Sequence, residues 1–386
     1  MFLEGFETAK DYLDNFIDRA LKGRVSDIHM ENRGAEGIMR VRIEGEMREW
    51  ARFPLDRMSL LIRRIKFISG LDPEHSGRTG EGRFEFDLNG QKIVMRLSVL
   101  PTQGSDDLVI RILGSAPDIF GLKQLNFDDT IREGLEFCVH KSMGLILVTG
   151  PTGSGKTSTL YAAIQEINDG SRKIITVEDP IEYKVQGLSQ IKMDPRYNVT
   201  YANVLRGVLR HDPDVILIGE CRELEAAEIA VEASMTGHLV LTTLHTNNAV
   251  SSILRMINLG VQEIDVSNSL TAAYAQRLIR KLCDDCKKET PVPEALKIAL
   301  GGKAPKHIYT PGTCDACGHT GFKGRMPVGE LLIIDDDVRD VIIAQPNLSS
   351  LNKVAKQKNM RTMLEYGLQL VAKGELDYMD VLHSVT

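Results

Sequence analysis

The spacing of apolar residues in the first part of the chain is typical of helices mixed with short strands. Apolar positions recur three and four residues apart over residues 8–21 and 54–68, which predicts two amphipathic helices. Glu44-Gly45 and Asn89-Gly90 are typical of hairpin turns. Runs that predict strands lie at residues 37–43, 46–50, 83–88, 92–99 and 108–113. Residues 1–115 are therefore expected to form an α+β domain, in which helices cover one antiparallel sheet.

The pattern changes after residues 116–121, which we interpret as a linker. Beyond it, predicted helices alternate with short, almost wholly apolar runs. Runs of this kind are typical of strands in a mostly parallel sheet that is buried on both faces, and ligands bind such a sheet at the carboxyl ends of its strands. From residues 322–325 onward the chain is expected to be helical to its end, with C-terminal helices at residues 335–386. The fold class is thus α/β, with a second domain at residues 122–386. The apolar runs of this second domain lie at residues 145–149, 174–177, 215–218 and 239–243.

Charge and composition argue against a nucleic-acid partner, a membrane span and a secretory signal. The chain has a net charge of −6, whereas a protein that wraps nucleic acid usually carries a basic face, so no nucleic-acid partner is expected. No apolar run approaches the roughly 20 residues of a membrane-spanning helix. The N-terminus has no basic segment followed by an apolar core, so it does not resemble a secretory signal. We therefore expect a cytoplasmic protein without a membrane span.

A glycine-rich stretch directly after the 145–149 run carries most of the predicted chemistry. It fits the phosphate-loop pattern G-x4-G-K-[ST] and precedes a helix predicted at residues 158–167. Glycines allow a tight turn, so that backbone N–H groups and a helix N-terminus surround a phosphate chain. Lys156 is expected to reach the β- and γ-phosphates of a nucleoside triphosphate, and Thr157 to hold Mg²⁺. The predicted nucleotide-binding residues are Gly150, Pro151, Thr152, Gly153, Ser154, Gly155, Lys156, Thr157 and Ser158.

Acidic residues and a histidine follow three of the other apolar runs. A phosphate-loop enzyme needs one carboxylate near Mg²⁺ and another group to orient the attacking water. Gly219 stands where the first acid is usual, so we assign Glu220 to the Mg²⁺ shell and Glu178 to the water. His245 is a candidate sensor of the γ-phosphate, with a hydrogen-bonded core histidine as the alternative. His238 is left open between the same two roles.

Arginine is the usual cation that neutralises a transferring phosphoryl group. Arg206, Arg210 and Arg222 flank the 215–218 run. Arg96 and Arg111 lie on predicted strands of the first domain, and each alternates with apolar neighbours. From spacing alone, Arg96 and Arg111 are expected to be solvated residues on the outer face of that sheet.

The cysteines at residues 281–326 predict a metal module. Cys283-x-x-Cys286 and Cys314-x-x-Cys317 supply four thiolates, which suits a closed, structural Zn²⁺ site. A redox pair, which would need only one Cys-x-x-Cys, is the less favoured alternative. His307 and His319 are possible substitute ligands. The segment between the two pairs contains Gly301-Gly302 and is expected to be a flexible excursion.

Taken together, these residues resemble the secretion ATPases that power type II secretion and type IV pilus assembly, a RecA-like group. The resemblance covers nearly the whole chain, and several of its motifs are long. The motifs are Ser26-Asp27-Ile28-His29, residues 96–102, the loop at 150–157, Val177-Glu178-Asp179-Pro180-Ile181-Glu182, residues 210–214 leading into Gly219-Glu220, and residues 237–246.

The resemblance implies a homohexameric ring that binds ATP between a PAS-like N-terminal domain and the RecA-like ATPase domain. It implies that Arg96 and Arg111 reach the phosphates, and that Arg206 and Arg222 form the family's basic pair. The cysteine pairs resemble the zinc module of assembly-type members, which retraction motors lack. The implied partner is an inner-membrane platform or assembly protein, to which the ring would be recruited peripherally.

Some features depart from the family pattern. Cys221 and Glu223 stand where Ile and Asp are more usual, and Ser105-Asp106-Asp107 replaces a Gly-Glu-Lys-like turn. The longer N-terminal module that docks many members on a membrane partner is missing, which leaves the mode of recruitment open.

The resulting hypothesis is a hexameric ATPase that hydrolyses ATP to power pilus assembly or type II secretion. Three alternatives stay open: a DNA-translocating ATPase, a pilus-retraction ATPase of the same superfamily, and a non-catalytic nucleotide-binding scaffold. DNA-stimulated hydrolysis would favour the first alternative, and an absence of hydrolysis would favour the last.

Overall fold

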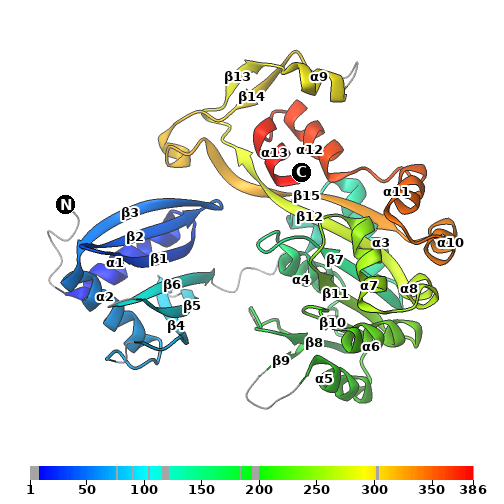
Figure 1. The fold of residues 1–386 in the computed structure, drawn as a ribbon, viewed down its shortest axis with the longest axis horizontal. Helices are drawn as coiled ribbons and strands as arrows, with labels where there is room; N and C mark the ends of the chain where they lie inside the picture. Colours follow the sequence, from blue (N-terminus) through cyan, green and yellow to red (C-terminus); the bar gives the residue numbers. More distant parts are fainter. Residues whose placement is uncertain are drawn as a thin grey trace. The chain divides into compact units, whose positions relative to one another are not determined.

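In a computed structural model, the chain folds into two compact units, Met1–Pro117 and Asp118–Thr386 (Figure 1). It describes residues 8–74, 77–88, 91–102, 105–114, 121–182, 184–193, 200–300 and 304–385. The expected turn at Asn89-Gly90, residues 116–120 of the expected linker and Gly301-Gly302 lie outside the described residues. None of the described helices is long and apolar enough to cross a membrane.

The first unit contains the expected antiparallel sheet, with the strand order β3-β2-β1-β6-β5-β4. Helices α1 and α2 bury their apolar faces in its core, which confirms both predicted helices. Thr8 caps α1, because its hydroxyl accepts a hydrogen bond from the Asp11 backbone N–H at 3.2 Å. The elements are α1 Ala9–Lys22, β1 Val25–Arg33, β2 Glu36–Ile43, β3 Glu46–Pro54, α2 Leu55–Ile68, β4 Gly80–Leu88, β5 Gln91–Thr102 and β6 Ser105–Gly114.

Strand β1 occupies the middle of this sheet, although the apolar pattern did not predict it. A shift in its register to β2 lies between Val25 and Asp27, and both of these residues are buried, as is Ile28. The irregularity breaks the alternation that identifies a strand from sequence. In addition, Asp27 is a buried polar residue at a position where an alternating strand would have an apolar one.

In the described part of the second unit, the larger sheet has the strand order β15-β12-β7-β11-β10-β8-β9. Every residue of β7, β8, β10 and β11 is buried, and these strands pair in parallel, so the prediction of a parallel sheet covered on both faces is confirmed. The strands are β7 Gly144–Thr149, β8 Ile174–Glu178, β9 Ser189–Lys192, β10 Val215–Ile218, β11 Leu239–Leu244, β12 Leu270–Leu282 and β15 Phe322–Ile333.

Helices pack on both faces of this sheet (Figure 1). The helix predicted after the glycine-rich turn is α4, which begins two residues earlier than expected, at Lys156. The helices are α3 Asp129–Val139, α4 Lys156–Glu166, α5 Tyr201–Val208, α6 Leu224–Met235, α7 Ala249–Leu259, α8 Glu263–Ser269, α10 Asp336–Ala344, α11 Leu348–Gln357, α12 Met363–Ala372 and α13 Tyr378–Val385.

The prediction that the chain is helical from residues 322–325 onward was wrong. Strand β15 continues to Ile333 and pairs antiparallel with β12, and the helices begin only at Asp336. Residues 326–330 of β15 are all buried, yet they include Pro327, Gly329 and Glu330. Their sequence therefore shows neither the alternation nor the continuous apolar run that marks a strand.

A buried ion pair joins α2 to the start of β6. The Lys66 ammonium donates to the Asp106 carboxylate, and both side chains are almost fully buried. The neighbouring Asp107 carboxylate accepts a hydrogen bond from the Asn32 backbone N–H at 3.0 Å. Both acidic residues of the unusual Ser105-Asp106-Asp107 sequence therefore connect β6 to other elements of the first unit.

Replacing Asp106 with alanine should lower the free energy of unfolding of the first unit by about 3–5 kcal/mol, because it removes one partner of a buried ion pair. The single tryptophan of the chain, Trp50, lies in this unit with its ring 5.5 Å from that of Phe16, so its fluorescence during urea unfolding is the measurement. The control is Lys92→Ala, whose partner Glu85 is exposed, and it should cost less than about 1 kcal/mol. Equal losses in the two variants would contradict the assignment.

Candidate nucleotide and metal sites

The predicted phosphate loop connects β7 to α4 at the carboxyl edge of the sheet. Gly150 and Gly155 have φ angles of +149° and +88°, which side chains rarely adopt. A Cβ atom at Gly150 would also lie 2.5 Å from the carbonyl oxygen of Gln276. No side chain caps α4, so none competes for its first backbone N–H groups. The loop thus has the conformation and the free donors that an anion requires.

The Lys156 ammonium lies folded over this loop. It donates to the carbonyl oxygens of Gly150 at 2.8 Å and Pro151 at 3.0 Å. Burial lowers the pKa of Lys156, and Arg277 lowers it further, while Glu220 opposes both. Because these two partners are neutral carbonyl groups, the ammonium can exchange them for phosphate oxygens without breaking an ion pair.

Three predicted site residues meet beyond the ends of β10 and β11. One oxygen of the Glu220 carboxylate lies 2.7 Å from Arg222 Nε and 3.0 Å from His245 Nε2. Burial raises the pKa of Glu220, but the hydrogen bond from Arg222 and the charges of His245 and Lys156 leave it below the usual value. Glu220 is therefore ionised at neutral pH and lies within the electrostatic reach of the loop lysine.

Glu178, assigned from sequence to the attacking water, lies in a different environment. Its carboxylate is 4% exposed and accepts hydrogen bonds from the hydroxyls of Tyr161 and Thr176 and from the Gln190 amide. These donors come from α4, β8 and β9. To act on a water molecule, Glu178 would have to release at least one of them, whereas Glu220 is partly open to solvent.

The two histidines of the family's His motif lie at opposite edges of the sheet. His245 follows the carboxyl end of β11, beside Glu220. His238 precedes β11, where its carbonyl accepts a hydrogen bond from the Gly144 N–H at 3.1 Å and its Nδ1 lies 2.9 Å from the Ala233 carbonyl. Since Gly144 begins β7 and the phosphate loop follows the end of β7, the structure does not bring His238 to the loop.

Three arginines of the first unit share one row of its sheet. Arg96 on β5 lies directly opposite Arg111 on β6 and also opposite Arg83 on β4. Arg96 pairs with Glu81 at 2.8 Å, and Arg111 with Asp27 at 2.8 Å. Like charges directly opposite each other destabilise a sheet. Placing these arginines opposite one another therefore does not stabilise the first unit by itself.

Two residues at the nucleotide site were missed by the sequence analysis. Gln276 on β12 is 1% exposed; its amide donates to the Ser154 carbonyl at 2.6 Å and accepts from the Thr159 hydroxyl at 2.7 Å. It therefore fixes the loop to the start of α4. The one signal in the sequence is a glutamine that follows the apolar run at residues 272–275.

The second missed residue is Tyr201, the first residue of α5. Burial raises the pKa of its phenol to about 12, and the charges of Asp179 and Glu220 add to this effect. The hydroxyl therefore remains protonated beside the acidic residues. Without the fold, nothing in the sequence connects residue 201 with the ends of β8 and β10.

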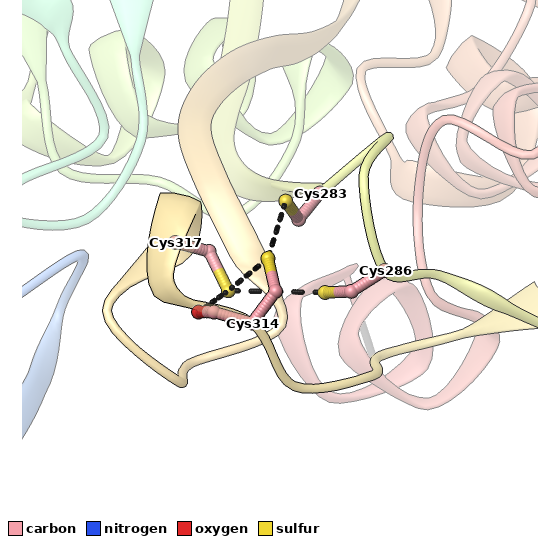
Figure 2. Close-up of side chains that lie close together, drawn as sticks. All are labelled: Cys283, Cys286, Cys314 and Cys317. Carbon is pink, nitrogen blue, oxygen red and sulfur yellow. Dashed lines mark hydrogen bonds between the residues drawn. The ribbon is translucent and has the colours of Figure 1, made fainter.

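The four cysteines of the predicted metal module converge on one point (Figure 2). Cys283 lies 3.8 Å from Cys314, Cys286 lies 3.8 Å from Cys317, and Cys314 lies 3.6 Å from Cys317, measured between sulfur atoms. A tetrahedral zinc ion with Zn–S bonds of about 2.3 Å needs sulfur atoms about 3.8 Å apart. A disulfide would need about 2.0 Å. The four sulfur atoms therefore lie close enough together to bind one Zn²⁺ ion.

His307 and His319 are not members of this cluster; among the described residues it consists of the four cysteines. His319 lies 3.1 Å from Asp315, and His307 lies 3.5 Å from Glu289.

The segment between the cysteine pairs is structured in its described residues, contrary to the expected flexible excursion. Strand β13 Lys288–Pro291 pairs antiparallel with β14 His307–Thr310, and α9 Glu294–Leu300 lies between them. Lys287 donates to the Gly374 carbonyl at 2.9 Å, which attaches the module to the loop after α12. Backbone pairing and this contact stabilise a segment that its glycines and prolines made appear irregular.

Comparison with known proteins identifies relatives along the whole chain. A family model described as "Type II/IV secretion system protein" matches residues 3–383. Type II secretion system protein E of Aeromonas hydrophila is 39% identical over 96% of this chain and 74% of its own length. The type IV pilus assembly ATPase PilB of Thermus thermophilus is 36% identical over 97% of this chain but 42% of its own length.

Solved structures agree with this assignment. The pilus retraction motor PilT with bound ADP aligns over 96% of both chains, with a TM-score of 0.64 and 31% identity. The Legionella pneumophila ATPase DotB aligns over 98% of this chain and 96% of its own, with a TM-score of 0.74; its identity of 21% makes this a likeness of fold. The phosphate loop, the residues gathered at its edge and these relatives together show that the chain belongs to the type II/IV secretion system protein family, the group of secretion and pilus ATPases.

Proposed function

We propose that the protein is an ATP-hydrolysing motor of a type II secretion or type IV pilus assembly machine. The observation that carries the proposal is the position of Glu220, with Arg222 and His245, within electrostatic reach of Lys156 on the phosphate loop. A carboxylate, cations and an uncapped helix N-terminus at one edge of a buried parallel sheet are what phosphoryl transfer to water requires.

The residues have distinct roles in this proposal. Backbone N–H groups of residues 150–158 bind the phosphates, and Lys156 moves from the loop carbonyls to the β- and γ-phosphates. Thr157 and Glu220 would hold Mg²⁺, which neutralises charge on the phosphates when bound. Glu220 also keeps Arg222 and His245 near the reacting group. Glu178 or Glu220 orients the water; Glu220 is the more accessible of the two.

The row of arginines in the first unit supports a role for that unit in catalysis. In a homohexameric ring, Arg96 and Arg111 would face ATP and exchange their present carboxylate partners for phosphate oxygens. The two arginines lie directly opposite each other, so both can contact one anion. Binding and hydrolysis would then change the angle between the two units, which is the motion that drives the machine.

The cysteine cluster supports assembly or secretion over retraction. In the family this module belongs to assembly-type members, and the curated relatives at 36–40% identity include secretion and pilus assembly proteins. We propose that the ring acts in the cytoplasm on an inner-membrane platform protein and that Zn²⁺ bound by the four cysteines stabilises the module.

Lys156→Ala and Glu220→Gln should each lower ATP turnover by at least about 10²-fold, because each removes a charge that acts on the reacting phosphates. Phosphate release by the purified protein is the measurement. Lys353→Ala, which changes an exposed lysine of α11, is the matched control and should hydrolyse ATP like the wild type. Wild-type turnover in either site variant would falsify the proposed function.

Arg96→Ala should lower turnover by about 10³-fold while changing the Kd for ADP by less than about threefold, because the arginine acts on charge that develops during transfer. Turnover and fluorescent-ADP titrations measure the two effects. Arg52→Ala, an exposed residue of β3 in the same unit, controls for loss of surface charge. A parallel loss of binding and turnover would remove the catalytic role of Arg96.

The purified protein should contain about one zinc ion per chain, and Cys314→Ser should lose it, because three thiolates hold the metal less tightly than four. Elemental analysis measures the content, and thermal unfolding with a chelator measures its contribution to stability. Cys138→Ala, which changes a buried cysteine outside the cluster, should keep its zinc. Zinc-free wild-type protein, or unfolding that a chelator leaves unchanged, would refute the metal site.

A further inference from the structure

Arg277, two residues beyond the point where β12 last pairs with β7, has hydrogen-bond partners on three segments. Its Nε donates to the Ser384 carbonyl on α13 at 3.1 Å, and its Nη1 to the Gln276 carbonyl at 3.2 Å. Its Nη2 donates to the Asn247 carbonyl at 3.1 Å, in the segment that follows His245. All these acceptors are neutral, and among the described residues no carboxylate forms an ion pair with this guanidinium.

This cation lies beside the phosphate loop. The Gln276 carbonyl oxygen accepts a hydrogen bond from Arg277, and the same oxygen leaves no room for a side chain at Gly150. The Gly150 carbonyl in turn accepts from Lys156. Two cations without a carboxylate partner among the described residues therefore lie close to Gly150.

Arg277 differs in this respect from four of the arginines that the sequence analysis selected. Arg96, Arg111, Arg206 and Arg222 each pair with a carboxylate. A half-buried cation without a counter-charge costs free energy. Burial lowers the pKa of Arg277, and the nearby Glu330, whose carboxylate accepts from the backbone N–H groups of Ala249 and Met363, offsets this only in part. An anion at the loop would supply the missing charge.

We propose that Arg277 binds the phosphates of the nucleotide together with Lys156, and that it releases the C-terminal end of α13 when it does so. The proposal rests on the nucleotide site proposed above and adds a residue and a consequence to it. A guanidinium that turns toward phosphate exchanges carbonyl acceptors for phosphate oxygens, and the Ser384 carbonyl is one of these acceptors. Occupancy of the loop is thereby transmitted to the last helix of the chain.

A second arginine of β12 provides a matched control. Arg280 also attaches α13, through hydrogen bonds of 3.0 and 2.7 Å to the Asp380 carboxylate, and its guanidinium lies 4.0 Å from the centre of the Phe322 ring. Arg280 has a carboxylate partner, so it has no need of an anion. Both residues hold the helix, but only Arg277 is expected to respond to phosphate.

The experiment compares the full-length wild type with Arg277→Gln, Arg277→Lys and Arg280→Gln. Calorimetric titration with Mg²⁺ and a slowly hydrolysed ATP analogue gives Kd, and hydrogen exchange with and without the analogue reports on the last turn of α13. Loss of one charge-assisted contact predicts at least about a tenfold higher Kd for Arg277→Gln. Arg277→Lys should recover part of the affinity, and Arg280→Gln should bind like the wild type.

Exchange in the last turn of α13 should rise on nucleotide binding in the wild type and in Arg280→Gln. In Arg277→Gln it should be high without nucleotide and unchanged by it. A wild type that binds no nucleotide would overturn the proposed function together with this inference. A wild type that binds, with Arg277→Gln showing the same Kd or the same exchange response, would overturn the inference alone.

Discussion

The close approach of the phosphate-loop backbone to β12 is the constraint on which the site depends. Gly150 lies against the Gln276 carbonyl, and the Gln276 side chain binds the loop at Ser154 and the helix at Thr159. A side chain at Gly150 would separate the two segments. Because these contacts hold the loop against β12, its N–H groups lie in place at the edge of the sheet before any ligand arrives, which reduces the cost of ordering the site on binding.

The parallel sheet explains why residues distant in sequence meet at that edge. Strands β10 and β11 run in parallel and in register, so the residues that follow them emerge side by side. Glu220 and His245 meet for this reason, and the same argument places His238 at the other edge. The direction of a strand, rather than the chemistry of a residue, decides which polar side chains can act together.

The β12–β15 pair connects the nucleotide site to the cysteine module and to the C-terminal helices. The cysteines lie at the far ends of these two strands, and Arg277 and Arg280 attach α13 to β12. The cysteine cluster at one end and the attachment of α13 along the strand connect this pair to both parts of the unit. An element of this kind can transmit a change at the phosphate loop to surfaces that a partner could contact.

The sequence by itself determined the phosphate loop, the apolar strands around it, the two cysteine pairs and the amphipathic helices, because each depends on spacing within a short segment. It did not determine β1, β12 or β15, since a register shift or continuous burial removes the alternation that marks a strand. Nor could it assign Gln276, Arg277 or the buried partners of Glu178. Those roles depend on segments tens of residues apart, and only the tertiary structure, through the order and direction of the strands, decides which of them touch.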